Sequence, residues 1–264
     1  MSPADLDPTR FRASLRALRL GQSFEYLPSC ASTNDEVAAR AMAGAEEGLL
    51  VVAGEQTAGR GRRGRVWQSP ANQNLTFSML LRPALPAQLV APMTLLAGAA
   101  LAASLAGLGF SPRLKWPNDV LLDTRAGPSK VAGILTEMAS EAGRVRHVVL
   151  GVGINVNTHA FPGELATRAT SLCLARGQHV DRGEVLAAFV NAFEPIYYDF
   201  VAHGPSAALA KWNDHALLGQ ICSVERNGQP TQGVAEGVDV SGALLVRTAA
   251  GEVISVHAGE VNWL

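Results

Sequence analysis

A long run of uncharged residues in the middle of the chain most limits how it can fold. Asp, Glu, Lys and Arg do not occur between Pro83 and Pro112, and a helix of that length could cross a bilayer. Proline and polar residues interrupt the run, however, and its alanines and glycines make it only weakly hydrophobic. The leucines have the spacing of a helix buried in a protein core. We therefore expect a core helix rather than a membrane span, with these leucines buried: Leu95, Leu96, Leu101, Leu105 and Leu108.

Composition limits the class of protein further. At about 150 residues per domain, a chain of 264 residues with 48% hydrophobic and 17% charged residues is expected to form one main domain and a smaller one. A net charge of −1 argues against a surface built as a whole for polyanions, so phosphate binding must be local. Three scattered cysteines without a CxxC motif disfavour a disulfide framework or a zinc site. The polar start, unlike a signal peptide, favours a cytoplasmic protein.

Apolar runs and helical spacings predict an α+β domain followed by a small β-barrel. Ser32 to Glu36 has the form of a capping box with Thr33 as the cap, and a helix is expected from there to about Ala43. Further helices are expected at 181–201 and around Lys211. Short alternating segments with turns at Asn227-Gly228, Ser241-Gly242 and Ala250-Gly251 follow Leu218 and predict the barrel. Strands of the main domain are expected at 48–54, 75–81, 113–116, 119–122, 131–139 and 145–157.

The stretch from Gly59 to Arg65 is the clearest candidate for binding an anion. Its seven residues hold four arginines and three glycines; arginine offers planar charged donors, and glycine lets backbone N–H groups approach a ligand. A solvated surface loop is the alternative. Phosphate-loop spacing fails because Arg65 and Val66 stand where Lys and Ser or Thr are required. A dinucleotide fingerprint beginning at Gly151 fails because Val156 replaces its third glycine.

Lysine is rare in this chain, with three residues against nineteen arginines. Lys115 opens the motif Lys-Trp-Pro-Asn-Asp, and Lys130 precedes an apolar strand step, Ala132-Gly133, from which its ammonium could reach a pocket. Simple solubility is the alternative for each lysine. The interval from Asp123 to Lys130 is expected to form a hairpin.

Taken together, these motifs resemble the biotin protein ligases, also called biotin–[acetyl-CoA-carboxylase] ligases. The resemblance covers residues 27 to 264 and implies a mixed-sheet catalytic domain of the class II synthetase type, followed by an SH3-like barrel. Only 26 residues precede residue 27, too few for a winged helix-turn-helix, so a monofunctional enzyme without DNA binding is expected. The motifs occur in the order 32–34, 55–65, 115–119, 130–135, 151–155 and 259–261.

The resemblance implies three segments and two half-reactions. An N-terminal arm (1–26) is expected before a catalytic domain (27–216) and a barrel (217–264). Biotin would attack the α-phosphate of ATP, with Mg²⁺ as cofactor, to give biotinyl-5′-AMP without a covalent enzyme intermediate. A lysine of a biotin carboxyl carrier domain, in acetyl-CoA carboxylase or another biotin-dependent carboxylase, would then take the biotinyl group. The chain ends at Leu264 without the basic tail of some relatives, which puts a barrel contribution to ATP binding in doubt.

Residues of these motifs match the chemistry that the two steps require. Two anions must be brought together, which needs local cations where charge develops. Catalytic roles are therefore expected for the cations Lys130, Arg60 and Arg62, and in the second step for Asp119. Asp119 would orient or deprotonate the carrier lysine, and Trp67 would stack on adenine. The residues expected to bind biotin are Ser32, Thr33, Asn34, Gln56, Gly59, Arg60, Gly61, Arg62, Lys130 and Gly133. Those expected to bind ATP or the adenylate are Arg62, Arg65, Trp67, Asn118, Lys130 and Asn155.

Two other functions remain open at this point. A lipoate or octanoate ligase shares the fold and the acyl-adenylate chemistry. A nucleic-acid-binding module could use the arginine-glycine loop, although this loop occurs once and lacks aromatic repeats. Neither metal ligands nor the choice between monomer and homodimer can be derived from the sequence.

Overall fold

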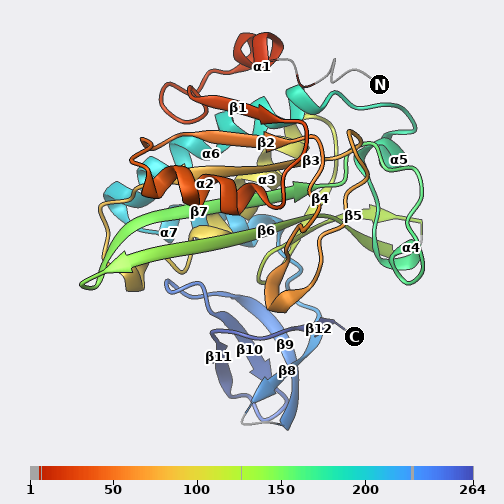
Figure 1. Ribbon diagram of the computed structural model, residues 1–264. Helices are drawn as coiled ribbons and strands as arrows, with labels where there is room; N and C mark the ends of the chain where they lie inside the picture. The colour runs from red at the N-terminus through yellow and green to blue at the C-terminus, as the bar shows by residue number, and fades with distance from the viewer. Residues whose placement is uncertain (1–5, 7, 126, 227–228, 264) are drawn as a thin grey trace.

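A computed structural model describes residues 6, 8–125, 127–226 and 229–263. Its main body is a seven-stranded sheet covered by helices, and a second sheet of five antiparallel strands lies at one end (Figure 1). The strand order is β1-β2-β3-β7-β6-β5-β4 in the large sheet and β11-β10-β9-β8-β12 in the small one. The pairing of β1 with β2 is parallel, and the other neighbours of the large sheet run antiparallel. The mixed α+β class predicted from the sequence is therefore confirmed.

The strands lie close to the predicted apolar runs. The large sheet contains β1 (Phe24–Leu27), β2 (Leu50–Ala53), β3 (Leu75–Leu81), β4 (Pro112–Lys115), β5 (Asp119–Thr124), β6 (Gly127–Glu141) and β7 (Arg144–Ile154). The small sheet contains β8 (Ile221–Arg226), β9 (Gln229–Val238), β10 (Leu244–Thr248), β11 (Val253–Val256) and β12 (Asn262–Trp263). The predicted turn at Asn227-Gly228 lies outside the described residues. The hairpin expected before Lys130 is formed by β5 and β6, where Thr124 pairs with Gly127.

Helices cover both faces of the large sheet, and four of them (α2, α3, α6 and α7) match the predicted ones. The α-helices are α1 (Pro8–Ser14), α2 (Thr33–Met42), α3 (Met93–Gly107), α4 (Leu165–Arg168), α5 (Leu172–Arg176), α6 (Arg182–His203) and α7 (Ser206–His215). The short 3₁₀ helices are η1 (Arg62–Gly64) and η2 (Ala87–Leu89).

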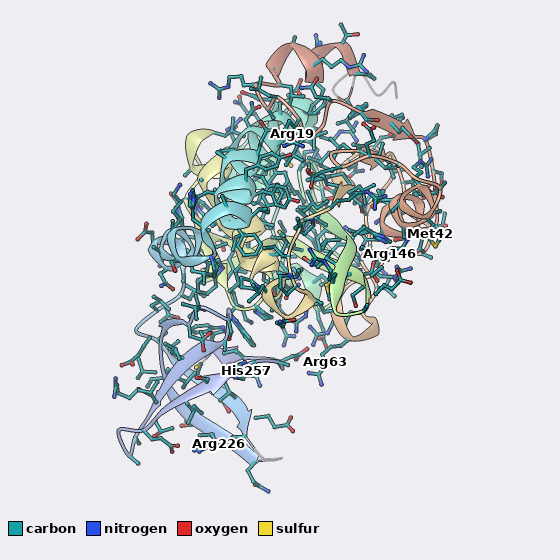
Figure 2. All side chains as sticks on the ribbon, turned by 90° about the vertical axis from the view of Figure 1, so that its left-hand side faces the viewer. Arg19, Met42, Arg63, Arg146, Arg226 and His257 are labelled. Carbon is teal, nitrogen blue, oxygen red and sulfur yellow. The ribbon has the colours of Figure 1, made fainter. Side chains whose placement is uncertain are left out.

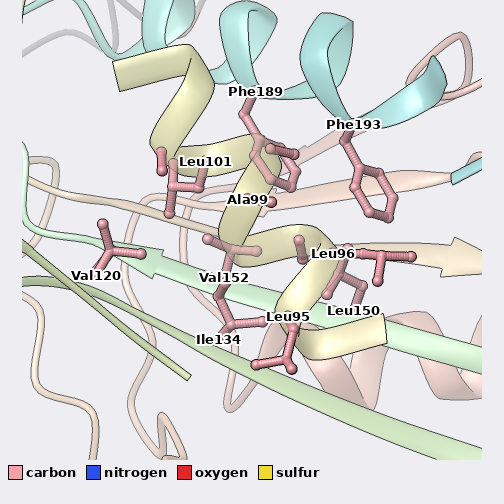
Figure 3. Packing of buried hydrophobic residues seen from close by; sticks show 14 of the residues in the cluster. Leu95, Leu96, Ala99, Leu101, Val120, Ile134, Leu150, Val152, Phe189 and Phe193 are labelled. Carbon is pink, nitrogen blue, oxygen red and sulfur yellow. The ribbon is translucent and has the colours of Figure 1, made fainter. Parts of the chain in front are cut away.

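The uncharged run forms the central helix of the core. Leu95, Leu96, Leu101 and Leu105 of α3 are buried, while Leu108, just after the helix, is partly buried against the same core. Figure 3 shows α3 between the sheet and the aromatic face of α6. By length and composition alone, both the stretch Ala87–Gly107 and α6 could span a membrane; 72% and 50% of their most apolar windows are buried inside the protein. The apolar character of α3 thus follows from its place in a core.

Strand β7 presents different side chains to the two faces of the sheet. Leu150, Val152 and Ile154 belong to the core cluster that includes α3 and α6. Alternate residues of a strand point to opposite faces, so Gly151 and Gly153 face the other side, on which α2 packs. The two glycines leave room on that face for side chains to lie against the backbone.

The segment that follows α1 is held to α6 by side-chain acceptors. Asn191 Oδ1 accepts hydrogen bonds from the backbone N–H groups of Arg16 and Ala17, at 2.6 and 3.0 Å. The carboxylate of Glu194 accepts from the three backbone N–H groups of residues 18–20, at 2.7 to 2.9 Å. Since Phe11 is fully buried, this part of the expected arm is packed into the main core.

The predicted cap of α2 is wrong in detail. Ser32 occupies the N-cap position, and neither its side chain nor that of Thr33 caps the helix. Gln56 Oε1 accepts from the backbone N–H of Thr33 at 2.7 Å and from its hydroxyl at 3.0 Å. A side chain remote in sequence therefore satisfies the first N–H of the helix, and Thr33 is drawn toward it.

Helix α1 and strand β1 were not predicted, because neither short segment has a distinct apolar period.

Candidate active site

The arginine-glycine stretch forms a narrow loop between β2 and β3. Trp67 N–H donates to Gly59 O at 2.9 Å, and Gly61 N–H donates to Arg65 O at 2.7 Å, so the two sides of the loop pair. A Cβ on Gly59 would lie 2.6 Å from Trp67 O, which only glycine avoids. At the tip, Arg63 and Gly64 have φ of 57° and 74°, a left-handed turn that glycine adopts easily. The glycines thus allow a tight turn that exposes arginine side chains.

Arg60 points from the loop to two carboxylates. Its guanidinium binds Asp35 of α2 through two hydrogen bonds, at 2.6 and 2.7 Å, and lies 3.4 Å from Glu137 of β6. The hydrogen bond from Arg60 lowers the pKa of Asp35, and the same bond raises the pKa of Arg60. Without a ligand, the charge of Arg60 is offset by the carboxylates of Asp35 and Glu137.

A buried polar cluster lies beside Arg60 on the glycine face of the sheet. Ser78 Oγ of β3 lies 2.7 Å from Thr33 Oγ1 and 2.5 Å from Asn34 Oδ1. Asn34 Nδ2 donates to Glu137 Oε2 at 2.5 Å. The Asn34 amide lies over Gly151, where a Cβ would approach its Oδ1 to 2.2 Å. Together with Gln56, these side chains offer several donors and acceptors in a small space.

A second, cationic cluster lies where β4, β5 and β6 adjoin. Lys130 Nζ and Asp119 Oδ1 are 2.6 Å apart, and both side chains are partly exposed. The Lys130 ammonium lies over Gly133, 3.2 Å from an ideal Cβ at that position. Arg62 reaches this cluster from the loop and donates to Asn118 Oδ1 at 3.4 Å. Burial lowers the pKa of Arg62, and the nearby Asp119 carboxylate opposes that effect.

Trp67 lies on the sheet between the two clusters. A Cβ at Gly153 would lie 2.4 Å from Cε2 of its indole, and one at Gly133 would lie 3.5 Å from Cζ3. Lys130 Nζ is 5.7 Å from the centre of an indole ring, within the range of a cation–π contact. The indole Nε1 is buried and lacks a hydrogen-bond partner among the described residues. The ring therefore lies against two glycine positions.

The loop also contacts the C-terminal sheet. Arg65 forms an ion pair with Glu260, which lies just before β12. Trp116 Nε1 of the Lys-Trp-Pro-Asn-Asp motif donates to Gly242 O at 2.9 Å. Figure 1 shows the loop reaching from the main body toward the small sheet, and in Figure 2 its Arg63 projects on that side. The small sheet is thus adjacent to the cationic cluster.

A cavity of about 430 Å³ opens beside Trp67. It lies between the segment 66–70 and the segment 158–165, with Gln56 and Gly59 on its wall. Asn74, which is 2% exposed, also lines it; its Oδ1 accepts from Val156 N–H and Thr158 Oγ1, both at 2.9 Å. Within the described part of the chain, its lining includes neither Lys130 nor Asp119. The cavity therefore lies next to the charged pair, and Trp67 is the residue that both share.

Comparison with known proteins identifies the family. The family model described as biotin/lipoate A/B protein ligase matches residues 26–155, and the biotin protein ligase C-terminal domain matches residues 217–262. The chain is 38% identical to the bifunctional ligase/repressor BirA of Bacillus spizizenii, over 98% of this chain and 80% of that protein. It is 34% identical to the biotin–[acetyl-CoA-carboxylase] ligase of Mycobacterium tuberculosis, over 97% and 96%. The chain belongs to the biotin protein ligase family.

A solved structure supports this assignment. The biotin protein ligase of Aquifex aeolicus in complex with biotin and ATP superposes with a TM-score of 0.78 and 28% identity, over 92% of this chain and 99% of that one. The match to a biotin protein ligase C-terminal domain favours a biotin ligase over a lipoate ligase. The chain is thus an ATP-dependent ligase that activates biotin and transfers it.

The structure brings most of the predicted residues of the ligase onto one face of the sheet. Thr33, Asn34, Gln56 and Arg60 meet at one end, and the cationic residues meet at the other. Asn155 differs from them: it is buried, and its Nδ2 donates to Thr170 O at 3.1 Å, so its amide also supports the chain near α5. The residues at the cationic end are Arg62, Arg65, Trp67, Asn118, Asp119, Lys130 and Gly133.

Sequence reasoning missed four polar residues that contact the predicted ones. Ser78 was read only as part of an apolar strand, although a hydroxyl inside a fully buried strand needs a partner. Asp35, Glu137 and Glu260 neutralise arginines of the loop. An excess of cations in one loop predicts acidic partners in general, but their positions depend on the fold.

Proposed function

We propose that this ligase joins biotin to ATP above Gly133 and Gly153, with the roles expected from the sequence. The observation that carries the proposal is the 2.6 Å pair of Lys130 and Asp119, which lies over Gly133 beside Arg62 and Trp67. An ammonium, a guanidinium and a carboxylate thus meet at a strip of backbone where glycines leave room for side chains and a ligand to approach. The two half-reactions require these groups: cations for the two anions that react in adenylate formation, and an acceptor for the amine proton in the transfer step.

The ureido ring of biotin would bind in the polar cluster. It has both N–H donors and a carbonyl acceptor, and Ser32, Thr33, Asn34 and Gln56 offer complementary groups. Gln56 Oε1 accepts two hydrogen bonds from Thr33 without a ligand. On binding, the Thr33 hydroxyl would exchange its bond to Gln56 for one to the ring, while the backbone N–H of Thr33 keeps its acceptor, so that no buried group is left unpaired.

The two loop arginines differ in their readiness to bind an anion. Arg60 is held by Asp35 and Glu137, so it would bind biotin's carboxylate only by sharing or breaking those contacts. Arg62, held by one long hydrogen bond to Asn118, is the better candidate for the α-phosphate. An incoming phosphate would also offset the cost of burying the Arg62 guanidinium.

Lys130 and Asp119 would act in succession. In the first step, Lys130 leaves Asp119 and donates to the biotin carboxylate, whose oxygen attacks the α-phosphorus as pyrophosphate departs. In the second step, the amine of the carrier lysine attacks the carbonyl carbon, and AMP leaves with the electrons of the broken anhydride bond. Asp119, freed from Lys130, accepts the proton that the amine loses.

The adenine would stack on Trp67 at the edge of the 430 Å³ cavity. Phe161, Pro162 and Leu165 supply apolar lining there, as nucleotide bases require. Mg²⁺ would enter with ATP, bound mainly through the phosphates and water; the described residues contain no group of three His, Cys, Asp or Glu that could hold a metal alone.

The macromolecular partners remain proposals. The family acts on biotin carboxyl carrier domains, and we expect such a domain of acetyl-CoA carboxylase or another biotin-dependent carboxylase. A cytoplasmic location and the absence of DNA and membrane binding also stay predictions, supported by the net charge of −1 and the buried position of α3. A homodimer stays open and is tested by the mass of the protein in solution.

ATP–pyrophosphate exchange tests the activation step directly. Purified protein is mixed with ATP, Mg²⁺, labelled pyrophosphate and either biotin or lipoate. We expect label to enter ATP only with biotin. Exchange that depends on lipoate, or on neither acid, would overturn the proposal.

A further inference from the structure

Lys115 lies in the site but has no role in the mechanism proposed above. It ends β4 and pairs in register with Asp119 of β5, so the two residues are direct neighbours across the strands. Its side chain is partly buried. Burial lowers the pKa of Lys115, the Asp119 and Glu260 carboxylates oppose this, and the positive charges of Lys130 and Arg65 add to it. Lys115 thus belongs to the cationic cluster.

The cations of this cluster differ in whether they have a carboxylate of their own. Lys130 is paired with Asp119, and Arg65 with Glu260. For Lys115, the described structure shows neither a side-chain hydrogen bond nor a carboxylate within 4.0 Å. A partly buried ammonium beside two other cations is costly without an anion. Only the more distant carboxylates of Asp119 and Glu260 therefore offset the charge of Lys115 until an anion binds.

The activation step supplies such an anion next to Lys130. As the biotin oxygen bonds to the α-phosphorus, the bond from that phosphorus to the bridging oxygen breaks. The electron pair of this bond leaves with pyrophosphate, so negative charge grows on the leaving group. Lys130 is engaged at the carboxylate in the proposed mechanism, and Lys115 lies on the far side of Asp119 from it in the strand order. An ammonium there would meet the departing phosphates.

We propose that Lys115 binds the β- and γ-phosphates of ATP and stabilises the pyrophosphate leaving group. The proposal rests on the function proposed above, since it assigns a further catalytic residue to the same site. The ammonium has three rotatable donors on a flexible stem, which suit a phosphate group that moves as its bond breaks. Lys115 acts in the first half-reaction only, because pyrophosphate has left before the carrier lysine attacks.

Measuring the two half-reactions separately tests this role. Lys115→Gln removes the charge and keeps much of the length, Lys115→Arg keeps the charge, and Lys211→Gln on the exposed face of α7 is the control. Single-turnover formation of biotinyl-AMP should fall by about 100-fold or more in Lys115→Gln, the loss typical of removing a donor to developing charge. Lys115→Arg should recover part of the rate, and Lys211→Gln should match the parent.

Transfer from preformed biotinyl-AMP to a carrier domain is the second readout. Lys115→Gln should keep it within about threefold of the parent, which also shows that the variant is folded. Added inorganic pyrophosphate should inhibit the parent more strongly than Lys115→Gln.

Three outcomes would overturn the inference: no loss in activation, equal losses in both steps, or a loss in transfer alone. The last would mean that Lys115 serves Asp119 instead of pyrophosphate. If the parent protein itself forms no biotinyl-AMP, the proposed function fails, and the role of Lys115 fails with it for a distinguishable reason.

Discussion

Gly153 of β7 is the position where one methyl group should disturb the site most selectively. The alanine Cβ in Gly153→Ala would lie 2.4 Å from Cε2 of Trp67, and 2.7 Å from both Cζ2 and Nε1. Ordinary contact begins at 3.4 Å, so the indole must move outward by about 1 Å. The backbone of β7 is held between β3 and β6, whereas Trp67 belongs to a loop. We therefore expect the indole to move and the strand to stay.

Two magnitudes follow from that difference in freedom. Overpacking costs about 1 to 3 kcal/mol, and a loop that can yield places Gly153→Ala at the low end. One kcal/mol lowers the midpoint of thermal unfolding by roughly 2 to 4 °C in a protein of this size. We therefore expect the midpoint of Gly153→Ala to lie only about 2 to 4 °C below that of the parent. A displacement of about 1 Å in a substrate-positioning group can cost about 100-fold in rate. We expect kcat/KM for ATP to fall by about 10- to 100-fold.

The assay is biotinyl-AMP formation at varied ATP, with thermal unfolding measured on the same samples. Gly107→Ala, at the end of α3, is the matched control, because a Cβ there meets nothing within 4 Å; it should leave both quantities unchanged or slightly raise stability. In a Trp67→Ala background, Gly153→Ala should cost less than about twofold, since the clash is gone. The reasoning is refuted if Gly153→Ala keeps the ATP kinetics of the parent, or if its effect is the same with and without Trp67.

Three further predictions concern the loop and the lysines. Lys130→Ala should slow single-turnover biotinyl-AMP formation by roughly 100- to 1000-fold, which corresponds to an activation barrier about 2.7 to 4 kcal/mol higher. Lys211→Ala should be nearly silent, and a loss of only a few-fold in Lys130→Ala would contradict the role of Lys130. Arg62→Gly should weaken retention of the adenylate more than recognition of the ureido ring, because a charge-assisted contact is lost while Thr33 and Gln56 remain; labelling of bystander lysines checks this, and labelling confined to the carrier counts against it. Trypsin cleavage at the arginines of the 59–65 loop should slow when biotin and ATP are added, since a bound anion offsets the repulsion among them; equal cleavage rates with and without ligands would show that the loop does not close over them.

Much of the fold was predictable because local patterns and tertiary packing agree. The leucines of α3 and the apolar run of β3 are both buried where the sequence expects, since an uncharged segment has few alternatives to a core. Helix α2 begins at Thr33, as its local sequence suggests, although the capping group is supplied by Gln56 rather than by the predicted side chain.

The motifs also predicted a set of site residues, because their order along the chain carries the family's signature, and the structure places most of these residues near one another. The contacts that each residue makes were decided by the tertiary structure. Glu137 comes 77 residues after Arg60, and Glu260 comes 195 residues after Arg65. Such partners depend on how strands and domains are placed in the fold. The sequence alone shows that the arginines need acidic partners, and it does not show which residues these are.

The glycines of β7 show the same division most clearly. The sequence shows a Gly-Val-Gly-Ile-Asn run that begins like a dinucleotide motif and then departs from it. The tertiary structure shows why glycine is needed: Asn34 lies against Gly151 and Trp67 lies against Gly153, and a Cβ would collide with each. The hydrophobic pattern determined which face of β7 enters the core. Only the approach of α2 and the loop decided that positions 151 and 153 on the opposite face must carry no side chain, because steric exclusion depends on neighbours that are distant in the chain.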